Sequence, residues 1–279
     1  MKKKTGKKKA SSIVTEFLIL LIAFLMLYPI IFMMFTSFKD NPEFFRNFWG
    51  PATSLHFENY SLAWGYLKDS FLNTIIICVI SVPGVLITGS LSAYAFARLR
   101  FPFKNFLYYM VLALMMVPNM LVLIPTFTMV ADMGILNTYW AVSLPAIANG
   151  EAFVIFVLRG FFAGLPEEVF ESARMDGANE LKIYTRIAVP LSMPIMGTVF
   201  IMRLLSDWND YLWPSITMSE PKMWPIAVAI KAFKAQFDLL PQWGPLYAGF
   251  ALTVVPLVIF FAFTMKYYVE GITSGAVKG

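Results

Sequence analysis

Apolar residues in this chain are gathered into long blocks separated by polar segments. Six blocks, each more than 20 residues long, occupy 13–36, 71–97, 105–130, 139–160, 193–216 and 246–268. An α-helix needs about 20 apolar residues to cross a hydrocarbon core of about 30 Å. The pattern therefore predicts an all-α polytopic membrane protein with six transmembrane helices. The first block follows a basic start but is too long for a secretory signal, so we expect an uncleaved first span.

The composition agrees with a membrane protein, and the residue types present argue against several kinds of functional site. Hydrophobic residues make up 58% of the chain and charged residues 14%, against about 45–50% and 25% in soluble domains. Cys78 is the single cysteine and His56 the single histidine, in an apolar block and a polar loop respectively. The sequence has no metal-ligand cluster, no nucleophile motif and no GxxxxGK[ST] loop, which argues against an enzyme and against a nucleotide site in this chain.

Basic residues are distributed unevenly between the two sides that six spans define. Segments 1–12, 98–104, 159–186 and the C-terminal end from Lys266 onward carry 15 Lys and Arg, whereas the alternate loops carry six. Positive residues favour the cytoplasmic side, so the net charge of +5 indicates membrane orientation and no nucleic-acid partner. We expect cytoplasmic tails at 1–12 and 269–279, an extracytoplasmic loop at 37–70, and a cell-membrane protein with both termini in the cytoplasm.

The longest polar segment of the second half is Leu165–Pro194. Its pattern predicts two short helices separated by Gly177, a residue suited to a left-handed turn. The second helix carries an apolar stripe at near-helical spacing, formed by Leu181, Tyr184, Ile187 and Leu191. Two interpretations remain open from the pattern alone. The helices pack only against their own bundle, or they dock into a groove on another protein.

The motif within this segment resembles a known family. Glu171–Ala178 reads ESARMDGA, and Ile187 begins IAVPLSMP; together they look like the EAA loop of ABC importer permeases, with Ser172 where alanine is commonest. Three further motifs resemble the maltose-type carbohydrate-uptake branch: Phe71-x-Asn73-Thr74, Trp208-Asn-Asp-Tyr-Leu-Trp213 and the GITSGAVKG end at 271–279. The resemblance covers nearly the whole chain.

The resemblance implies a type I ABC importer permease fold with its core at 70–268 and a cytoplasmic coupling loop at 163–192. A coupling helix would sit in a cleft on an ATPase subunit, using Glu171, Ser172, Ala173, Asp176, Gly177 and Ala178. Supporting positions would be Leu165, Pro166, Ile187, Pro190 and Pro194. The implied partners are a second homologous permease, two copies of an ATP-binding subunit, an extracytoplasmic sugar-binding protein and the lipid bilayer. ATP and Mg would bind the ATPase, and this chain would bind no cofactor.

Polar residues inside the spans are candidates for the substrate pathway, because such groups are costly in lipid and face the bundle interior. The candidates are Asn119, Asn149, Glu151, Asp207, Asn209 and Asp210, together with the aromatic residues Trp208, Tyr211 and Trp213. Arg203 and Asp207 are four residues apart and could neutralise each other. An alternative function is a secondary transporter driven by an ion gradient through charged residues of the fifth span. The external loop at 217–245 would reach the binding protein or lie on the lipid surface.

Overall fold

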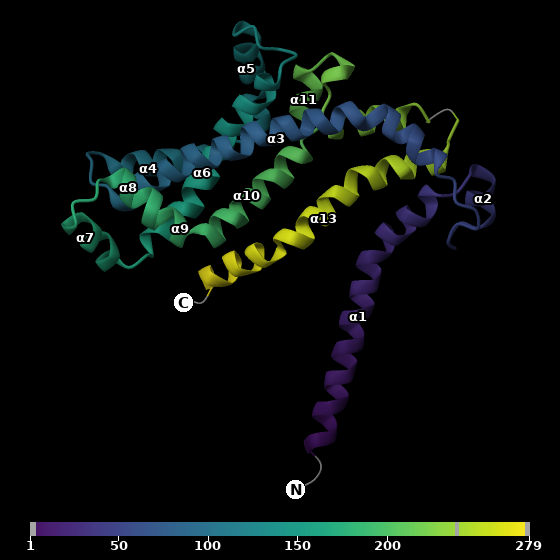
Figure 1. Cartoon of the computed structure of the whole chain (residues 1–279), viewed down its shortest axis with the longest axis horizontal. Coiled ribbons are helices and arrows are strands. Elements are labelled where there is room, and N and C mark those ends of the chain that lie inside the picture. The colour runs from purple at the N-terminus through teal and green to yellow at the C-terminus, as the bar shows by residue number, and fades with distance from the viewer. Residues whose placement is uncertain (1–3, 238–239, 277–279) are drawn as a thin grey trace. The chain divides into compact units, whose positions relative to one another are not determined.

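The computed structural model describes residues 4–237 and 240–276, and all regular structure in them is helical (Figure 1). The first helices are α1 (Lys4–Ser37), α2 (Asn41–Arg46), α3 (Glu58–Arg98), α4 (Lys104–Leu114), α5 (Asn119–Asp132) and α6 (Tyr139–Ala163). They are followed by α7 (Glu167–Met175), α8 (Glu180–Ile183), a π-helical turn (Tyr184–Ala188), α9 (Val189–Leu191) and α10 (Met193–Trp208). The last elements are α11 (Leu212–Thr217), a 3₁₀ turn (Pro221–Met223), α12 (Ile226–Ala235) and α13 (Trp243–Ala276). The expected tails at 1–12 and 269–279 lie partly outside the described residues.

Among the described residues, four helices are long and apolar enough to cross a membrane, and six if each bent helix pair is one span. The first pair, α4 and α5, meets at 96°, where Pro118 interrupts the expected third span. In the second pair, Glu180–Leu191 meets α10 at 79°. The expected fifth span at 193–216 is also interrupted, because α10 ends at Trp208 and α11 begins at Leu212. Broken helices at membrane depth are tolerated where the backbone is buried in protein or lines a cavity.

The helical boundaries differ from the expected ones in the two segments that were expected as long loops. The segment expected as a loop at 37–70 contains α2 and the first turns of α3, which begins at Glu58. The expected loop at 217–245 contains α12. The apolar-block pattern missed these helices because a helix outside the membrane needs no continuous apolar run.

The chain divides into two compact units, residues 1–67 with 232–255 and residues 68–231 with 256–279. In the second unit α3 packs closely on α6 through glycines. A Cβ on Gly84 would lie 2.5 Å from Ile147 Cδ1, and one on Gly89 would lie 2.7 Å from Val154 Cγ1. Small residues let membrane helices approach in this way. The core of this unit continues from α3 and α6 to α7, α8 and α10.

In the first unit, the start of α13 packs against the segment that follows α1. The Phe44 and Trp243 rings stack with centroids 4.9 Å apart, and the Trp243 backbone N–H donates to Asn41 Oδ1 at 2.9 Å. Lys39 is fully buried, and its Nζ donates to the carbonyls of Asn47 at 2.5 Å and Phe48 at 3.1 Å. These contacts fix the C-terminal end of α1 within this unit.

Candidate functional site

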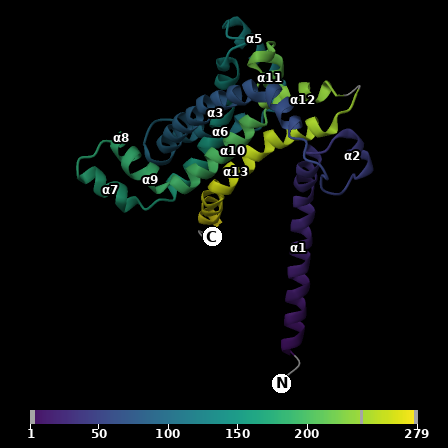
Figure 2. The same cartoon turned by 45° about the vertical axis from the view of Figure 1, so that its right-hand side comes forward.

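Helices α7 and α8 form a hairpin at the end of the second unit, away from α5 and α11 (Figures 1 and 2). Phe170 of α7 is fully buried and joins Ile183, Tyr184 and Ala188 in the core of this unit. Burying a Phe side chain contributes about 1.5–3 kcal/mol. The hairpin is therefore held on the bundle by its own apolar residues.

The buried stripe of the second helix differs from the expected one. Leu181 and Leu191 are exposed, whereas Ile183, Tyr184 and Ala188 are buried. The predicted stripe therefore divides between the core and the surface, and the π-helical turn at 184–188 changes the angular spacing of the residues around it. Leu165 and Ile187, two of the expected supporting positions, pack against the core.

The turn between the two helices has the geometry that its residues favour. Gly177 has φ of +76°, in the left-handed region that glycine adopts without steric cost. Asn179 then caps α8, because its side chain accepts a hydrogen bond from the Lys182 N–H at 2.8 Å. Pro166 lies just before α7 rather than at its first position. Pro190 lies within α9 and Pro194 in the first turn of α10.

The motif residues Glu171–Ala178 divide between the surface and the core. Glu171, Ser172, Asp176 and Gly177 are exposed, whereas Ala173 and Ala178 are partly buried against the core. The structure therefore brings four of these six residues to one exposed end of the hairpin, together with Met175, which is 89% exposed.

The acidic residues near the motif differ in their partners. Glu167 pairs with Arg98 and, at 3.2 Å, with Arg174. Glu180 accepts a hydrogen bond from Arg174 Nε at 3.0 Å. Glu171 takes part in none of the ion pairs found among the described residues. Two acids therefore stabilise the hairpin internally, and Glu171 presents its charge to the outside.

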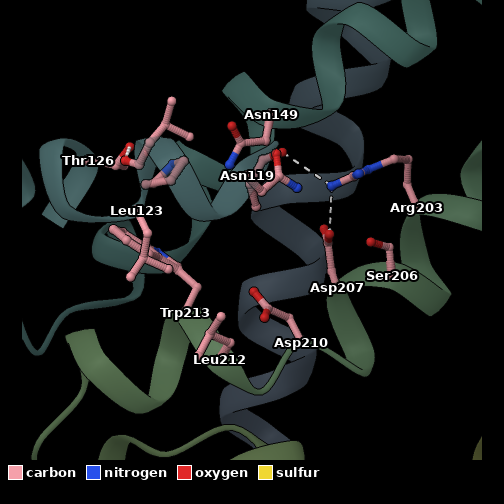
Figure 3. A pocket seen from close by; sticks show the side chains of 13 residues that line it. Asn119, Leu123, Thr126, Asn149, Arg203, Ser206, Asp207, Asp210, Leu212 and Trp213 are labelled. Carbon is pink, nitrogen blue, oxygen red and sulfur yellow. Dashed lines mark hydrogen bonds and ion pairs between the residues drawn. The ribbon is translucent and has the colours of Figure 1, made fainter. Parts of the chain in front are cut away.

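A polar cavity of about 300 Å³ lies between α5, α6, α10 and α11 (Figure 3). Its wall includes an ion pair, since Arg203 Nη2 lies 2.7 Å from Asp207 Oδ1. Arg203 also donates to the carbonyl of Ala146 at 3.2 Å, and Ser81 Oγ donates to Asp207 Oδ2 at 2.5 Å. The expected neutralisation of Arg203 by Asp207 is thus present, with both groups further hydrogen-bonded.

Five of the nine pathway candidates line this cavity, namely Asn119, Asn149, Asp207, Asp210 and Trp213. The remaining four do not line it. Glu151 accepts a hydrogen bond from Thr88 Oγ1. Trp208 packs against Phe71 with ring centroids 6.2 Å apart, Asn209 donates to the Leu205 carbonyl at 2.8 Å, and the Tyr211 ring lies 3.5 Å from Lys231 Nζ.

Three polar lining residues were absent from the pathway candidates, namely Thr126, Arg203 and Ser206. The spacing of the sequence could have pointed to two of them, because Arg203 and Ser206 precede the candidate Asp207 on one helix face at positions i, i+3 and i+4.

The Phe71-x-Asn73-Thr74 motif anchors the segment that follows α11. Asn73 Nδ2 donates to the carbonyls of Lys222 at 2.8 Å and Trp224 at 3.1 Å, while its Oδ1 accepts from Tyr139 Oη at 2.9 Å. Thr74 Oγ1 accepts from the Ile226 N–H at 2.7 Å. Both side chains are buried. The motif thus holds the segment that follows α11 on α3.

Comparison with known proteins places these features in a family. Residues 85–274 match the family described as binding-protein-dependent transport system inner membrane component. The chain is 31% identical to the arabinooligosaccharides transport system permease protein AraQ of Halalkalibacterium halodurans, over 98% of this chain and 100% of that protein. It is 33% identical to the melibiose/raffinose/stachyose import permease protein MelC of Bacillus subtilis, over 90% of this chain and 91% of that protein.

A solved structure has the same fold. The match is a chain from the crystal structure of a bacterial ABC transporter that imports the acidic polysaccharide alginate, with a TM-score of 0.82 and 24% identity over 96% of this chain and 100% of that chain. This confirms the expected all-α permease fold. The family match covers residues 85–274, more than half of the chain. The chain therefore belongs to the family of binding-protein-dependent transport system inner membrane components, the permease subunits of ABC importers.

Proposed function

We propose that this chain is one of two homologous permease subunits of an ATP-driven importer that moves an oligosaccharide across the cell membrane. The relatives named for arabinooligosaccharides and for melibiose, raffinose and stachyose support a sugar substrate. The family description supports delivery by an extracytoplasmic binding protein. Two ATP-binding subunits complete the assembly in this proposal, and they hold the ATP and Mg.

The observation that carries the coupling role is the exposed, unpaired charge of Glu171 on a hairpin whose other side is buried. In this proposal Glu171, Ser172, Asp176 and Gly177 enter a cleft on the ATPase, and Glu171 pairs with a basic residue there. Ala173 and Ala178 lie behind them and allow close approach. A short helix seated in a groove is a common mode of protein recognition. Closure of the two ATPases would then move the hairpin as a rigid body.

The cavity supports a place for this chain in the substrate pathway. Asn119, Asn149 and Asp210 present amide and carboxylate groups, which suit sugar hydroxyls, and Trp213 adds an aromatic face to the same wall. Trp208, Asn209 and Tyr211 are assigned no sugar contact, because other groups of the chain engage them. The ion-gradient alternative is not favoured, since the family match identifies an importer of another class.

Both termini and the hairpin are assigned to the cytoplasm in this proposal, and α12 to the opposite side. The distribution of 15 against six basic residues supports this orientation. The hairpin then faces the compartment that contains ATP.

The experiment is purification of the tagged chain in mild detergent from its own cells, followed by identification of the proteins that accompany it. We expect an ATP-binding subunit and a second permease. Reconstituted vesicles should then accumulate one of three labelled sugars, arabinotriose, raffinose or diacetylchitobiose, when ATP is enclosed with the ATPase and the sugar-binding protein is added outside. An uncoupler should leave uptake unchanged while ATP is maintained. Uptake that needs an ion gradient and no ATP would overturn the proposal.

A further inference from the structure

Arg98, the last residue of α3, lies where three helices meet. Its Nη1 pairs with Glu167 at the start of α7. Its Nη2 donates to the carbonyls of Phe162 and Leu165, each at 2.6 Å. Its guanidinium carbon lies 4.0 Å from the centroid of the Phe170 ring. The side chain is only 6% exposed, and these contacts engage both terminal nitrogens, whereas Nε has no hydrogen-bond partner among the described residues.

Each contact has a physical reason. The carbonyls of Phe162 and Leu165 lie at the C-terminal end of α6 and just beyond it, where helical carbonyls lack intrahelical donors and the helix dipole favours a cation. A guanidinium presents several N–H groups in a fixed plane and stacks on an aromatic ring, whereas an ammonium group does neither. Arg98 therefore binds the end of α6 and the start of α7 simultaneously.

A second connection lies one helical turn before Arg98. Tyr94 Oη donates to Glu180 Oε2 at 2.6 Å, and Glu180 also binds Arg174 of α7 at 3.0 Å. Arg174 Nη1 donates to Glu167 Oε1 at 3.2 Å. The cytoplasmic end of α3 is thus linked to both helices of the hairpin by a continuous polar network.

We propose that Arg98 is a positioning residue that locks α7 to α3, so that the docking hairpin and α3 move together when the ATPase subunits close. The chain connection from α6 to α7 is the short segment Gly164–Pro166, which by itself does not fix the angle of α7. Separating α7 from α3 would leave a nearly buried guanidinium without its carboxylate, a strongly unfavourable state. The inference rests on the proposed function, because it concerns how motion of the docked hairpin enters the membrane bundle.

The test measures whether α7 and α3 keep their separation during the ATP cycle. Spin labels are placed at Glu168→Cys on the exposed start of α7 and at Leu91→Cys on the exposed side of α3, with buried Cys78 replaced by alanine. The whole complex, purified with its ATPase, is measured by double electron–electron resonance without nucleotide and with ATP plus EDTA. No sugar is required.

We expect one label distance that is the same in both states in the otherwise native complex. Arg98→Ala should shift or broaden the distance distribution when ATP is added, and Arg98→Lys should do so less, because one charge remains. Arg100→Ala removes an exposed arginine two residues away and should behave as the native residue. An ATP-dependent shift in the native complex, or no shift in Arg98→Ala, would overturn the proposal.

Two further arms keep the test decisive. If Arg98→Ala does not assemble, Arg98→Lys and Tyr94→Phe replace it, since the latter removes only the hydroxyl that binds Glu180. Tyr94→Phe should then broaden the ATP-state distribution, and a native distribution for both variants would overturn the proposal. Failure of the proposed function has a separate signature, because the native chain would then purify without any ATP-binding subunit.

Discussion

Single residues decide where this chain can be packed closely and where it remains open to a partner. Gly244 lies at a close backbone approach, since a Cβ there would be 2.1 Å from the Lys39 carbonyl oxygen. Gly177 instead lies in open space and is required by its positive φ. Glu171 and Glu167 lie one turn apart on α7 but differ in use, because only Glu167 is paired within the chain. Residue type alone would not distinguish these roles.

Gly244→Ala should destabilise the first unit, because its new methyl group would overlap backbone atoms that cannot rotate away. We expect a loss of about 1–3 kcal/mol in the free energy of unfolding, measured as a lower melting temperature in detergent. The matched control is Gly160→Ala in α6, where no atom lies within 4 Å of the added Cβ. Alanine there should be neutral or stabilise by up to about 1 kcal/mol. Equal melting temperatures for the two variants would contradict the packing described.

His56 should titrate above its ordinary range. The hydrogen bond between its Nδ1 and Glu58 Oε1, 2.6 Å long, together with the charges of Glu58, Asp40 and Glu43, raises the pKa of His56 against a smaller opposing effect of burial. A raised folded pKa means that the contribution to stability is fully present below the unfolded pKa of about 6.5 and is lost as pH rises through the folded value.

The histidine is the only one in the chain, so NMR of histidine-labelled protein reports its pKa directly. Glu58→Gln should lower this pKa toward the ordinary value. Glu220→Gln removes an acid that is not among the groups acting on His56 and should leave the pKa unchanged. An unchanged pKa in Glu58→Gln would show that the hydrogen bond does not control the titration.

At the scale of elements, the apolar blocks predicted which segments enter the membrane but not where their helices break. The third block is divided at Pro118 and the fifth after Trp208, because the breaks depend on the cavity into which the freed polar groups project. The helix α12 escaped prediction, since its place depends on side chains far away in the sequence such as Asn73. The resemblance of Glu171–Ala178 to a known loop pointed to Glu171. No sequence pattern pointed to the network around Arg98, because its members lie far apart along the chain.

Asn73 should control the order of the segment after α11. Asn73→Ala removes its hydrogen bonds to Lys222, Trp224 and Tyr139 and leaves two partly buried carbonyls without these donors, a cost of about 1–3 kcal/mol. Hydrogen–deuterium exchange should therefore become faster at 222–226. The control is Asn209→Ala, which loses a single exposed bond to the Leu205 carbonyl and should leave exchange at 222–226 unchanged. Native exchange rates in Asn73→Ala would contradict the anchoring role.

The whole molecule is a membrane subunit in which the hairpin and the segment after α11 are proposed to face opposite compartments. Within the second unit, α3 contacts both of them. It contacts the hairpin through Arg98 and Tyr94, and the segment after α11 through Asn73 and Thr74. The aromatic segment before α3 belongs to the first unit and is proposed to lie on the same side as α12. The side of the membrane that each segment faces therefore depends on the whole chain, and no single contact establishes it.

The orientation is tested with single cysteines in a chain whose Cys78 is replaced by alanine. Trp49→Cys and Met175→Cys occupy positions that are 68% and 89% exposed. In intact cells stripped of their wall or outer layer, a membrane-impermeant maleimide should label Trp49→Cys at once and Met175→Cys only after the membrane is opened. The reverse pattern would place the hairpin outside and contradict the proposed topology.

The central claim, that the hairpin of α7 and α8 docks on an ATPase, is tested most directly by a charge reversal. Glu171→Lys should lower the amount of ATP-binding subunit that co-purifies with the tagged chain by about tenfold or more, because a like charge would face the basic residue expected in the cleft. Glu168→Lys, on the same exposed helix but outside the motif, should leave co-purification at the native amount. Native co-purification and native ATP-driven uptake in Glu171→Lys would contradict the account.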